Sequence, residues 1–160
     1  MEYQSSGHTL ENILAEHPFL KEMKKQHLQL IAGCASNVRF KAKEFLFRQG
    51  EAANQFFLIR HGEVSLEFYV RHRGVVKIQT IGENDILGWS WLFPPFLWEF
   101  DARAMEPIRA IALDGSCLRD KCEVDHEFGY YVLKWLAHIM AQRLQKTRFQ
   151  LLDIYASAKK

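Results

Sequence analysis

A series of short segments with period-two hydrophobicity, running from Ser36 to Leu113, is the feature that most constrains the fold. Turn signals such as Gln49-Gly50-Glu51 and His61-Gly62 separate these segments, and glycine supplies positive φ in a tight turn at little cost. About eight short strands at a spacing of roughly 8–12 residues are typical of a sandwich or barrel. We therefore predict a mainly β protein with flanking helices, built on a jelly-roll barrel (a double-stranded β-helix). The expected strands lie near residues 38–40, 45–47, 56–60, 64–70, 75–81, 86, 100–104 and 108–113.

Helical patterns flank the strands on both sides. Before the strands, apolar residues recur at helical spacing. Pro18 interrupts this helical pattern, and Gly33 ends it. We expect an N-terminal helical segment over residues 1–33, a β-barrel over 34–114 and C-terminal helices over 115–160. All three belong to one structural domain.

The C-terminal part predicts a short helix capped by Asp114 and a long helix that Asp125 caps and that runs to about Tyr155. One apolar stripe of the long helix suits packing on the barrel: Phe128, Val132, Trp135, Leu136 and Ile139. A second stripe alternates steps of four and three residues, as in a coiled coil: Leu133, Ala137, Met140, Leu144, Thr147, Leu151 and Ile154. We interpret this second stripe, called the seam below, as the interface of a homodimer. The alternative is that it is more core.

The amino-acid composition argues against a nucleic-acid-binding or membrane protein. The 160 residues are 48% hydrophobic and 25% charged, as in a folded soluble domain, and the net charge of +2 gives no global attraction to nucleic acid or anionic lipid. The N-terminus lacks a basic stretch followed by an apolar core, and no apolar run approaches the ~20 residues that span a bilayer. We expect a cytoplasmic protein that binds neither nucleic acid nor membrane.

The three cysteines, Cys34, Cys117 and Cys122, contain no CxxC pair. We expect reduced thiols in a cytosolic chain, with a metal or redox role as the alternative.

The segment from Gly88 to Trp98, GWSWLFPPFLW, breaks the strand pattern. It is too aromatic for an ordinary exposed loop, and its prolines exclude a regular strand. We expect it to bury itself as one short helical turn over 90–93, ended by Pro94-Pro95.

At this point the sequence resembles a known family. Residues 43–64, KEFLFRQGEAANQFFLIRHGEV, resemble the signature of cyclic-nucleotide-binding domains, roughly G-E-x-L-F-x-x-G-[ED]-x-A-[DN]-x-x-[FY]-x-[IL]-x-x-G-x-[VI]. Only the first glycine departs, since Lys43 replaces it. Residues 140–147, MAQRLQKT, resemble the central helix of the bacterial catabolite-activator type of regulator. The resemblance covers roughly residues 18–155.

The resemblance implies a ligand cassette after the sixth strand. In the family this cassette has a Gly-Glu pair, a short helix, and an arginine followed by a small residue. The glutamate accepts from the ribose 2′-hydroxyl, and the arginine and helix N-terminus hold the cyclic phosphate. Here Gly88 is retained, but Trp89 takes the glutamate position, Trp98 the arginine position and Glu99 the place of the small residue. The amide cluster of Trp89, Ser90 and Trp91 remains, as does Thr147, which matches the base-contacting threonine.

These departures predict weak binding of cyclic nucleotides, because a lost charge-assisted hydrogen bond at each end costs roughly 1.5–3 kcal/mol. Arg103 is the other candidate for a phosphate contact. Strand alternation places it on one face with Glu99 and Asp101, so we interpret it as a member of a surface ion pair. The candidate pocket comprises Gly88, Trp89, Ser90, Trp91, Trp98, Glu99, Arg103 and Thr147.

We therefore predict a ligand-sensing regulatory domain with a non-standard ligand, no enzymatic activity and no cofactor beyond a weakly bound cyclic nucleotide. The alternative is a degenerate module whose tryptophans fill the pocket and which acts as a dimeric scaffold, with a partner protein as the other binding candidate. A DNA-binding regulator of the catabolite-activator class needs about 70 further residues for a helix-turn-helix. A cupin-type enzyme needs a metal on a His-x-His pair, which the seven histidines do not form. We assign no catalytic and no metal-binding residues.

Overall fold

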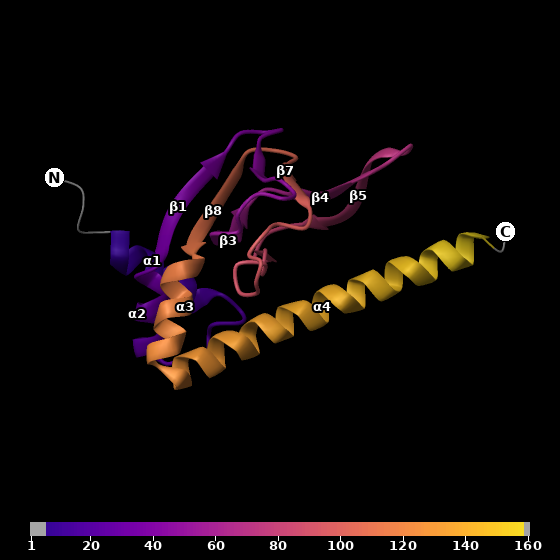
Figure 1. The fold of residues 1–160 in the computed structure, drawn as a ribbon. Coiled ribbons are helices and arrows are strands. Elements are labelled where there is room, and N and C mark those ends of the chain that lie inside the picture. Colours follow the sequence, from indigo (N-terminus) through magenta and orange to yellow (C-terminus); the bar gives the residue numbers. More distant parts are fainter. Residues whose placement is uncertain (1–5, 159–160) are drawn as a thin grey trace.

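The computed structural model describes residues 6–158 and has the predicted mainly β jelly-roll fold with flanking helices. Figure 1 shows the strands gathered above a long C-terminal helix that runs out beneath them. The helices are α1 (Ser6–Glu16), α2 (Lys25–Ala32), α3 (Gly115–Val124) and α4 (His126–Ala158). The strands are β1 (Ala35–Phe40), β2 (Phe45–Phe47), β3 (Gln55–His61), β4 (Val64–Val70), β5 (Gly74–Ile81), β6 (Ile86–Leu87), β7 (Asp101–Ala104) and β8 (Ile108–Asp114).

The strands form two antiparallel four-stranded sheets in the orders β1-β8-β3-β6 and β2-β7-β4-β5. One core lies between the sheets and a second lies between the first sheet and the helices. Strand β3 serves both: Phe57 and Ile59 belong to the first core, while Phe56 and Leu58 belong to the second. Burial on both faces explains why this strand is a continuous apolar run rather than an alternating one.

Lys43 occupies the first glycine position of the family signature and has a φ of 74°. This left-handed backbone conformation favours glycine, because a Cβ atom is crowded there. The backbone geometry of the signature is therefore present although the glycine is not.

Both predicted caps of the C-terminal helices are present. The Asp114 side chain accepts a hydrogen bond of 2.9 Å from the Cys117 amide, and the Asp125 side chain accepts one of 3.0 Å from the Phe128 amide. These carboxylates satisfy amides that have no partner within the first turn of each helix.

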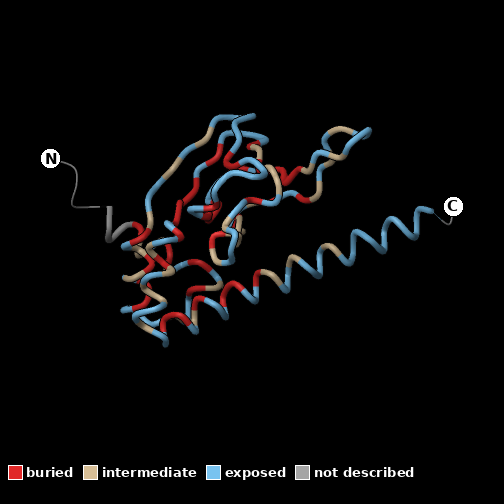
Figure 2. Tube along the Cα trace, in the orientation of Figure 1, coloured by how far each residue is buried: buried red, intermediate tan, exposed pale blue. Residues whose placement is uncertain are grey.

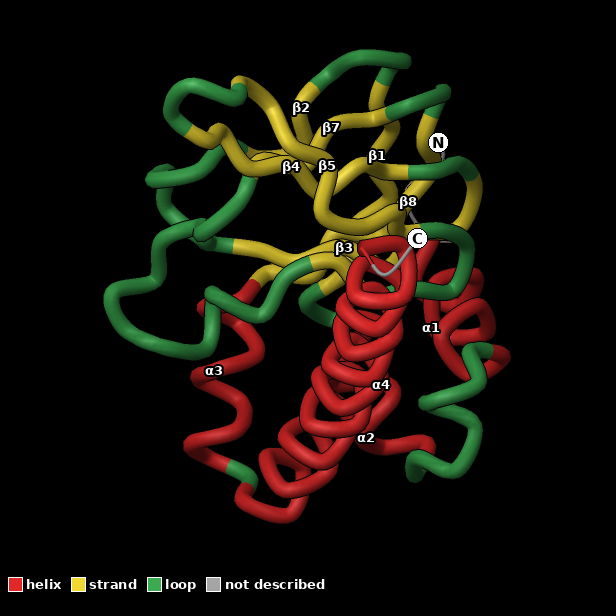
Figure 3. The backbone as a smooth tube through the Cα atoms, turned by 90° about the vertical axis from the view of Figure 1, so that its right-hand side faces the viewer, coloured by secondary structure: helices red, strands yellow, loops and turns green. Residues whose placement is uncertain are grey.

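Helix α4 has a buried face along its first half only. Figure 2 shows buried and exposed positions alternating along its first half and an exposed distal half, and Figure 3 shows it running between α3 and α1. The predicted barrel-facing stripe is confirmed, since its members are all buried: Phe128, Val132, Trp135, Leu136 and Ile139. No helix among residues 6–158 is long and apolar enough to cross a membrane.

The expectation of three reduced thiols is wrong for this structure. The fold brings the end of α2 to the start of α3, where the Asp114 amide donates to the Cys34 carbonyl. Cys34 and Cys117, with Cα atoms 5.7 Å apart, form a disulfide across 83 residues of sequence, and Cys122 is free. Sequence spacing gave no sign of this pairing, because it depends on the packing of α3 beside α2.

Candidate functional site

A cavity of about 400 Å³ lies between the barrel and α4. Its walls come from β2, β4 and β5, from the segment that leads from β6 to β7, and from α4. Most of the lining is apolar: Phe47, Leu66, Ile78, Leu87, Trp89, Trp98, Phe100, Met140 and Leu144. The other lining residues are Gly88 and the polar or charged Gln79, Ser90, Glu99, Arg143 and Thr147.

Two of the residues predicted for the pocket do not line it. Trp91 is fully buried in the core between the first sheet and the helices, where it stacks on Phe56 with ring centroids 4.7 Å apart. Arg103 forms an ion pair elsewhere, described below. The structure does bring the remaining predicted residues together around the cavity: Gly88, Trp89, Ser90, Trp98, Glu99 and Thr147.

Trp98 is the residue that the family resemblance aligns with the phosphate-binding arginine. It is 5% exposed and stacks on the Phe47 ring, with centroids 3.8 Å apart and an interplanar angle of 9°. Its indole also covers Gly88, where a Cβ atom would lie 2.5 Å from the ring. Gly88 has a φ of 99°, so both the backbone and the close approach of Trp98 require glycine at this position. Trp98 forms a fixed apolar wall.

The expected helical turn over residues 90–93 is wrong. The segment contains turns and bends rather than a helix, and two local hydrogen bonds close its turns: the Leu92 amide donates to the Trp89 carbonyl at 3.1 Å, and the Phe96 amide donates to the Phe93 carbonyl at 2.9 Å. Burial of the Trp91 side chain draws the chain inward, and prolines 94 and 95 have no amide hydrogen with which to extend a helix. The helix N-terminus that would attract a phosphate is therefore missing from this cassette.

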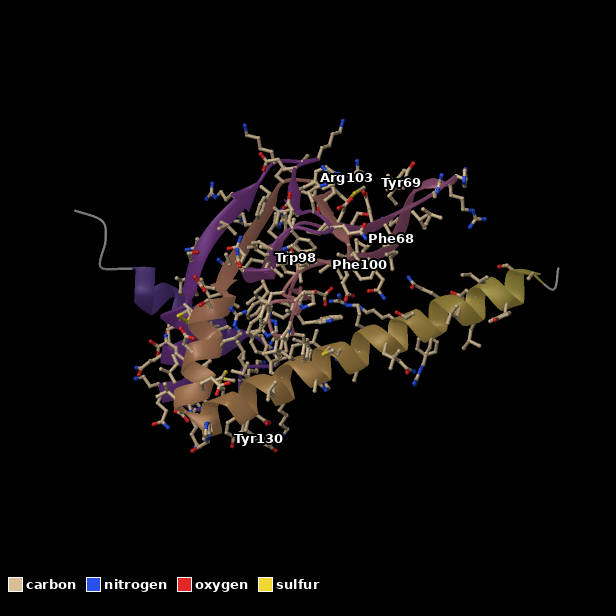
Figure 4. The ribbon with its side chains drawn as sticks, in the orientation of Figure 1. Phe68, Tyr69, Trp98, Phe100, Arg103 and Tyr130 are labelled. Carbon is tan, nitrogen blue, oxygen red and sulfur yellow. A yellow bond between two sulfur atoms is a disulfide. The ribbon has the colours of Figure 1, made fainter. Side chains whose placement is uncertain are left out.

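Arg103 lies on the side of the barrel away from α4, whereas Trp98 lies nearer α4 (Figure 4). Its guanidinium donates from Nη2 and Nε to one carboxylate oxygen of Glu67 on β4, at 2.7 and 3.0 Å. Arg103 therefore forms an ion pair, but its partner is a buried glutamate on the neighbouring strand and not a surface carboxylate of its own segment. Of the two carboxylates expected beside it, Asp101 pairs with Arg48 at 3.5 Å and Glu99 lines the cavity.

Arg143 is a cavity residue that the pocket prediction missed. Its Nη2 donates a hydrogen bond of 2.8 Å to the Ile86 carbonyl, and its guanidinium carbon lies 5.3 Å from the centroid of the Trp89 ring. Burial lowers the pKa of Arg143 below its ordinary value, and the nearby Asp85 carboxylate opposes that shift. The sequence held one signal, because Arg143 lies one helical turn after Ile139 and extends the barrel-facing stripe with a cation.

The predicted dimer seam is divided by the cavity. Met140, Leu144 and Thr147 line the cavity of their own barrel. Leu144 is still 51% exposed. Outside the cavity, Leu133, Leu151 and Ile154 are 52%, 50% and 64% exposed, and Ala137 is exposed as well. Three seam residues thus contact the cavity of their own chain. The other four form an apolar stripe on the surface of α4.

Within residues 6–158, no group of three or more histidine, cysteine, aspartate or glutamate side chains is placed to hold a metal ion.

The comparisons with known proteins agree with this geometry. Residues 37–125 match the cyclic nucleotide-binding domain family. No curated protein sequence gives a significant match to the chain. Among solved structures, a putative cyclic nucleotide-binding protein from Geobacter metallireducens is 24% identical with a TM-score of 0.75, over 85% of this chain and 98% of that one. A cyclic nucleotide-binding domain from Methylobacillus flagellatus is 16% identical with a TM-score of 0.78, over 92% and 83% of the two chains.

The sensor domain of the transcriptional regulator DNR from Pseudomonas aeruginosa is also similar in fold. It is 16% identical, with a TM-score of 0.69, over 87% of this chain and 93% of that one. These identities show a shared fold, while the family match covers more than half of the chain. The protein therefore belongs to the cyclic nucleotide-binding domain family.

Proposed function

We propose that this protein is a non-catalytic, ligand-sensing regulatory domain whose ligand is a largely apolar small molecule. The cavity between the barrel and α4 is the observation that carries this proposal. Its volume of about 400 Å³ is within the range of roughly 300–1,000 Å³ that small-molecule sites occupy. A ligand there would touch the barrel and α4 at once, and could shift the balance between two positions of the helix.

Cyclic nucleotides are poor candidates for this ligand. Trp89 and Trp98 line the cavity where the family resemblance expects a ribose-binding glutamate and a phosphate-binding arginine. The cassette lacks a helix, and Glu99 adds a negative charge at the rim. Two lost charge-assisted contacts at roughly 1.5–3 kcal/mol each convert a micromolar ligand into a millimolar one.

The alternative of a self-filled pocket has less support. Trp91 is packed into the core and does not line the cavity, whereas Trp89 and the largely buried Trp98 form walls of a space that they leave open. A scaffold without a ligand would gain stability by closing this space, since unfilled apolar cavities destabilise a protein.

We also propose that the protein acts as a homodimer through the exposed part of the seam. Leu133, Leu151 and Ile154 form an apolar stripe that water alone would cover in a monomer. The stripe begins beside the cavity residues of α4, so ligand contacts and subunit contacts would share one helix.

A neutral fluorescent probe tests the proposed site. N-phenyl-1-naphthylamine should bind the wild-type protein in a 1:1 ratio and slow hydrogen exchange of the α4 amides around residues 140–147. Met140→Trp should fill the cavity and reduce probe affinity at least tenfold, while Leu133→Trp, on the same helix but outside the cavity, should leave affinity unchanged. Equal binding to all three proteins would contradict the assigned site.

A further inference from the structure

The guanidinium of Arg143 lies at an apolar cavity and forms no salt bridge with any described residue, although the Asp85 carboxylate is near enough to favour its charged form. It is the only lysine or arginine side chain among the described residues that line the cavity. None of the carboxylates in residues 6–158 forms an ion pair with it. Buried or partly buried charges in proteins are ordinarily paired, so this cation needs an explanation.

Its hydrogen bonds leave most of its donors free for a ligand. A guanidinium has five N–H donors, and the Ile86 carbonyl accepts from Nη2 alone. No Arg143 nitrogen is among the fully buried, unpartnered atoms of the described chain, so the remaining donors face accessible space. Desolvation also lowers the pKa of Arg143, which is the consequence of a cation held in apolar surroundings.

The rest of the cavity favours an apolar body. Phe47, Trp89, Trp98 and Phe100 supply aromatic walls, and planar rings pack well against such faces. Glu99 is the lining residue with a negative charge, and it is exposed at the rim, where water and salt screen it.

We propose that the ligand of this cavity is an aromatic or otherwise apolar carboxylic acid, whose carboxylate pairs with Arg143 while its body packs between Trp98 and α4. Guanidinium and carboxylate match in geometry and can form two parallel hydrogen bonds. This inference rests on the proposed function, because it requires that the cavity binds a small molecule. It adds the charge of the ligand and the residue that recognises it.

A pair of isosteric probes tests the charge preference directly. 2-Naphthoate and 2-naphthamide have the same ring and nearly the same shape, but only the first is an anion. In calorimetric titrations the wild-type protein should bind naphthoate at least tenfold more tightly than naphthamide. This ratio needs no variant, so it remains informative if a substitution prevents folding.

Variants then assign the preference to a residue. Arg143→Gln should abolish the acid–amide ratio, and Arg143→Lys should retain part of it. Lys146→Gln removes an exposed cation from the same helix and should leave the ratio unchanged. A wild-type ratio near one, or a ratio that survives in Arg143→Gln, would overturn the carboxylate inference while the proposed function stands. If neither probe nor the neutral naphthylamine binds, the proposed function itself fails.

Discussion

The Gln79 side chain on β5 donates a hydrogen bond of 3.1 Å to the Thr147 hydroxyl on α4. The same hydroxyl donates to the Arg143 carbonyl at 3.0 Å, and Gln150 donates to the Ile78 carbonyl at 3.1 Å. Side-chain hydrogen bonds therefore connect the edge of the cavity to the distal half of α4. A ligand that displaces β5 would act on the part of the helix that carries the exposed seam.

Thr147→Val keeps the shape of the side chain but removes the hydroxyl, so Gln79 loses its partner. Loss of one partner of a partly buried hydrogen bond costs about 1–3 kcal/mol. We expect faster hydrogen exchange of amides 147–158, where few other contacts hold the helix. In a double-mutant cycle, adding Gln79→Leu should have little further effect. Independent, additive effects of the two substitutions would show that the contact does not couple the strand to the helix.

Leu151→Asp tests the homodimer. Leu151 lies on the exposed seam and does not line the cavity, so a charge there should separate the subunits without closing the ligand site. Sedimentation at micromolar concentration should show a dimer for the wild type and a monomer for the variant. Phe149→Asp is the matched control, because Phe149 is 57% exposed on the opposite face of α4 and should leave the dimer intact. A monomeric wild-type protein would contradict the proposed interface.

Gly88→Ala should destabilise the fold by about 1–3 kcal/mol, since it combines a positive φ with a Cβ atom that meets the Trp98 indole. Gly82→Ala is the control, because nothing lies within 4 Å of the added Cβ atom at that position. Urea unfolding followed by Trp fluorescence compares the two variants. Equal stability of both would mean that Trp98 does not pack over Gly88.

The Cys34–Cys117 disulfide predicts one reactive thiol in the denatured, unreduced chain, that of Cys122. Because the bridge closes a loop across 83 residues, its loss through Cys34→Ser should lower the free energy of unfolding by about 2–5 kcal/mol. Cys122→Ser should have a much smaller effect. Three reactive thiols in the denatured, unreduced wild type would contradict the disulfide.

His17 predicts a loss of stability at acidic pH. Burial lowers its pKa from the ordinary value of 6.5, while the hydrogen bond to the Asn84 carbonyl and the charge of Asp85 oppose the shift. Below pH 6.5 the unfolded chain therefore binds a proton more readily than the folded one, and stability falls as pH falls. His17→Gln retains a donor for the Asn84 carbonyl but cannot titrate, so its unfolding free energy should fall less between about pH 7.5 and about pH 5.5. If the unfolding free energies of the wild type and His17→Gln fall equally with pH, then His17 does not cause the loss of stability.

The sequence predicted the fold well because local signals agreed with one another. Strand alternation, hairpin turns and the caps Asp114 and Asp125 all depend on neighbouring residues, and the observed elements follow them. The exceptions depend on packing between distant segments. The disulfide requires α2 beside α3, and the partner of Arg103 is set by the register that places Ser65 opposite Arg103, which brings Glu67 within reach.

The cavity was predicted in part. The family resemblance located Gly88, Trp89, Trp98 and Thr147, which lie together at the cavity. Arg143 was missed because a lone arginine on an amphipathic helix is typical of the solvated face, and the sequence pattern does not show that the barrel covers it. The absence of a helix in the cassette follows from burial of Trp91, which no local pattern separates from an exposed tryptophan.

The central claim is that this cavity binds cyclic nucleotides only weakly, and isothermal titration calorimetry with cyclic AMP tests it most directly. The cavity lies where the family binds its ligand, but tryptophans occupy the positions of the ribose-binding glutamate and the phosphate-binding arginine. With Trp89 and Trp98 at these two positions, we predict a dissociation constant no better than roughly 0.1–1 mM. Binding in the micromolar range would contradict the account, since it would require a phosphate and ribose site that these walls do not provide.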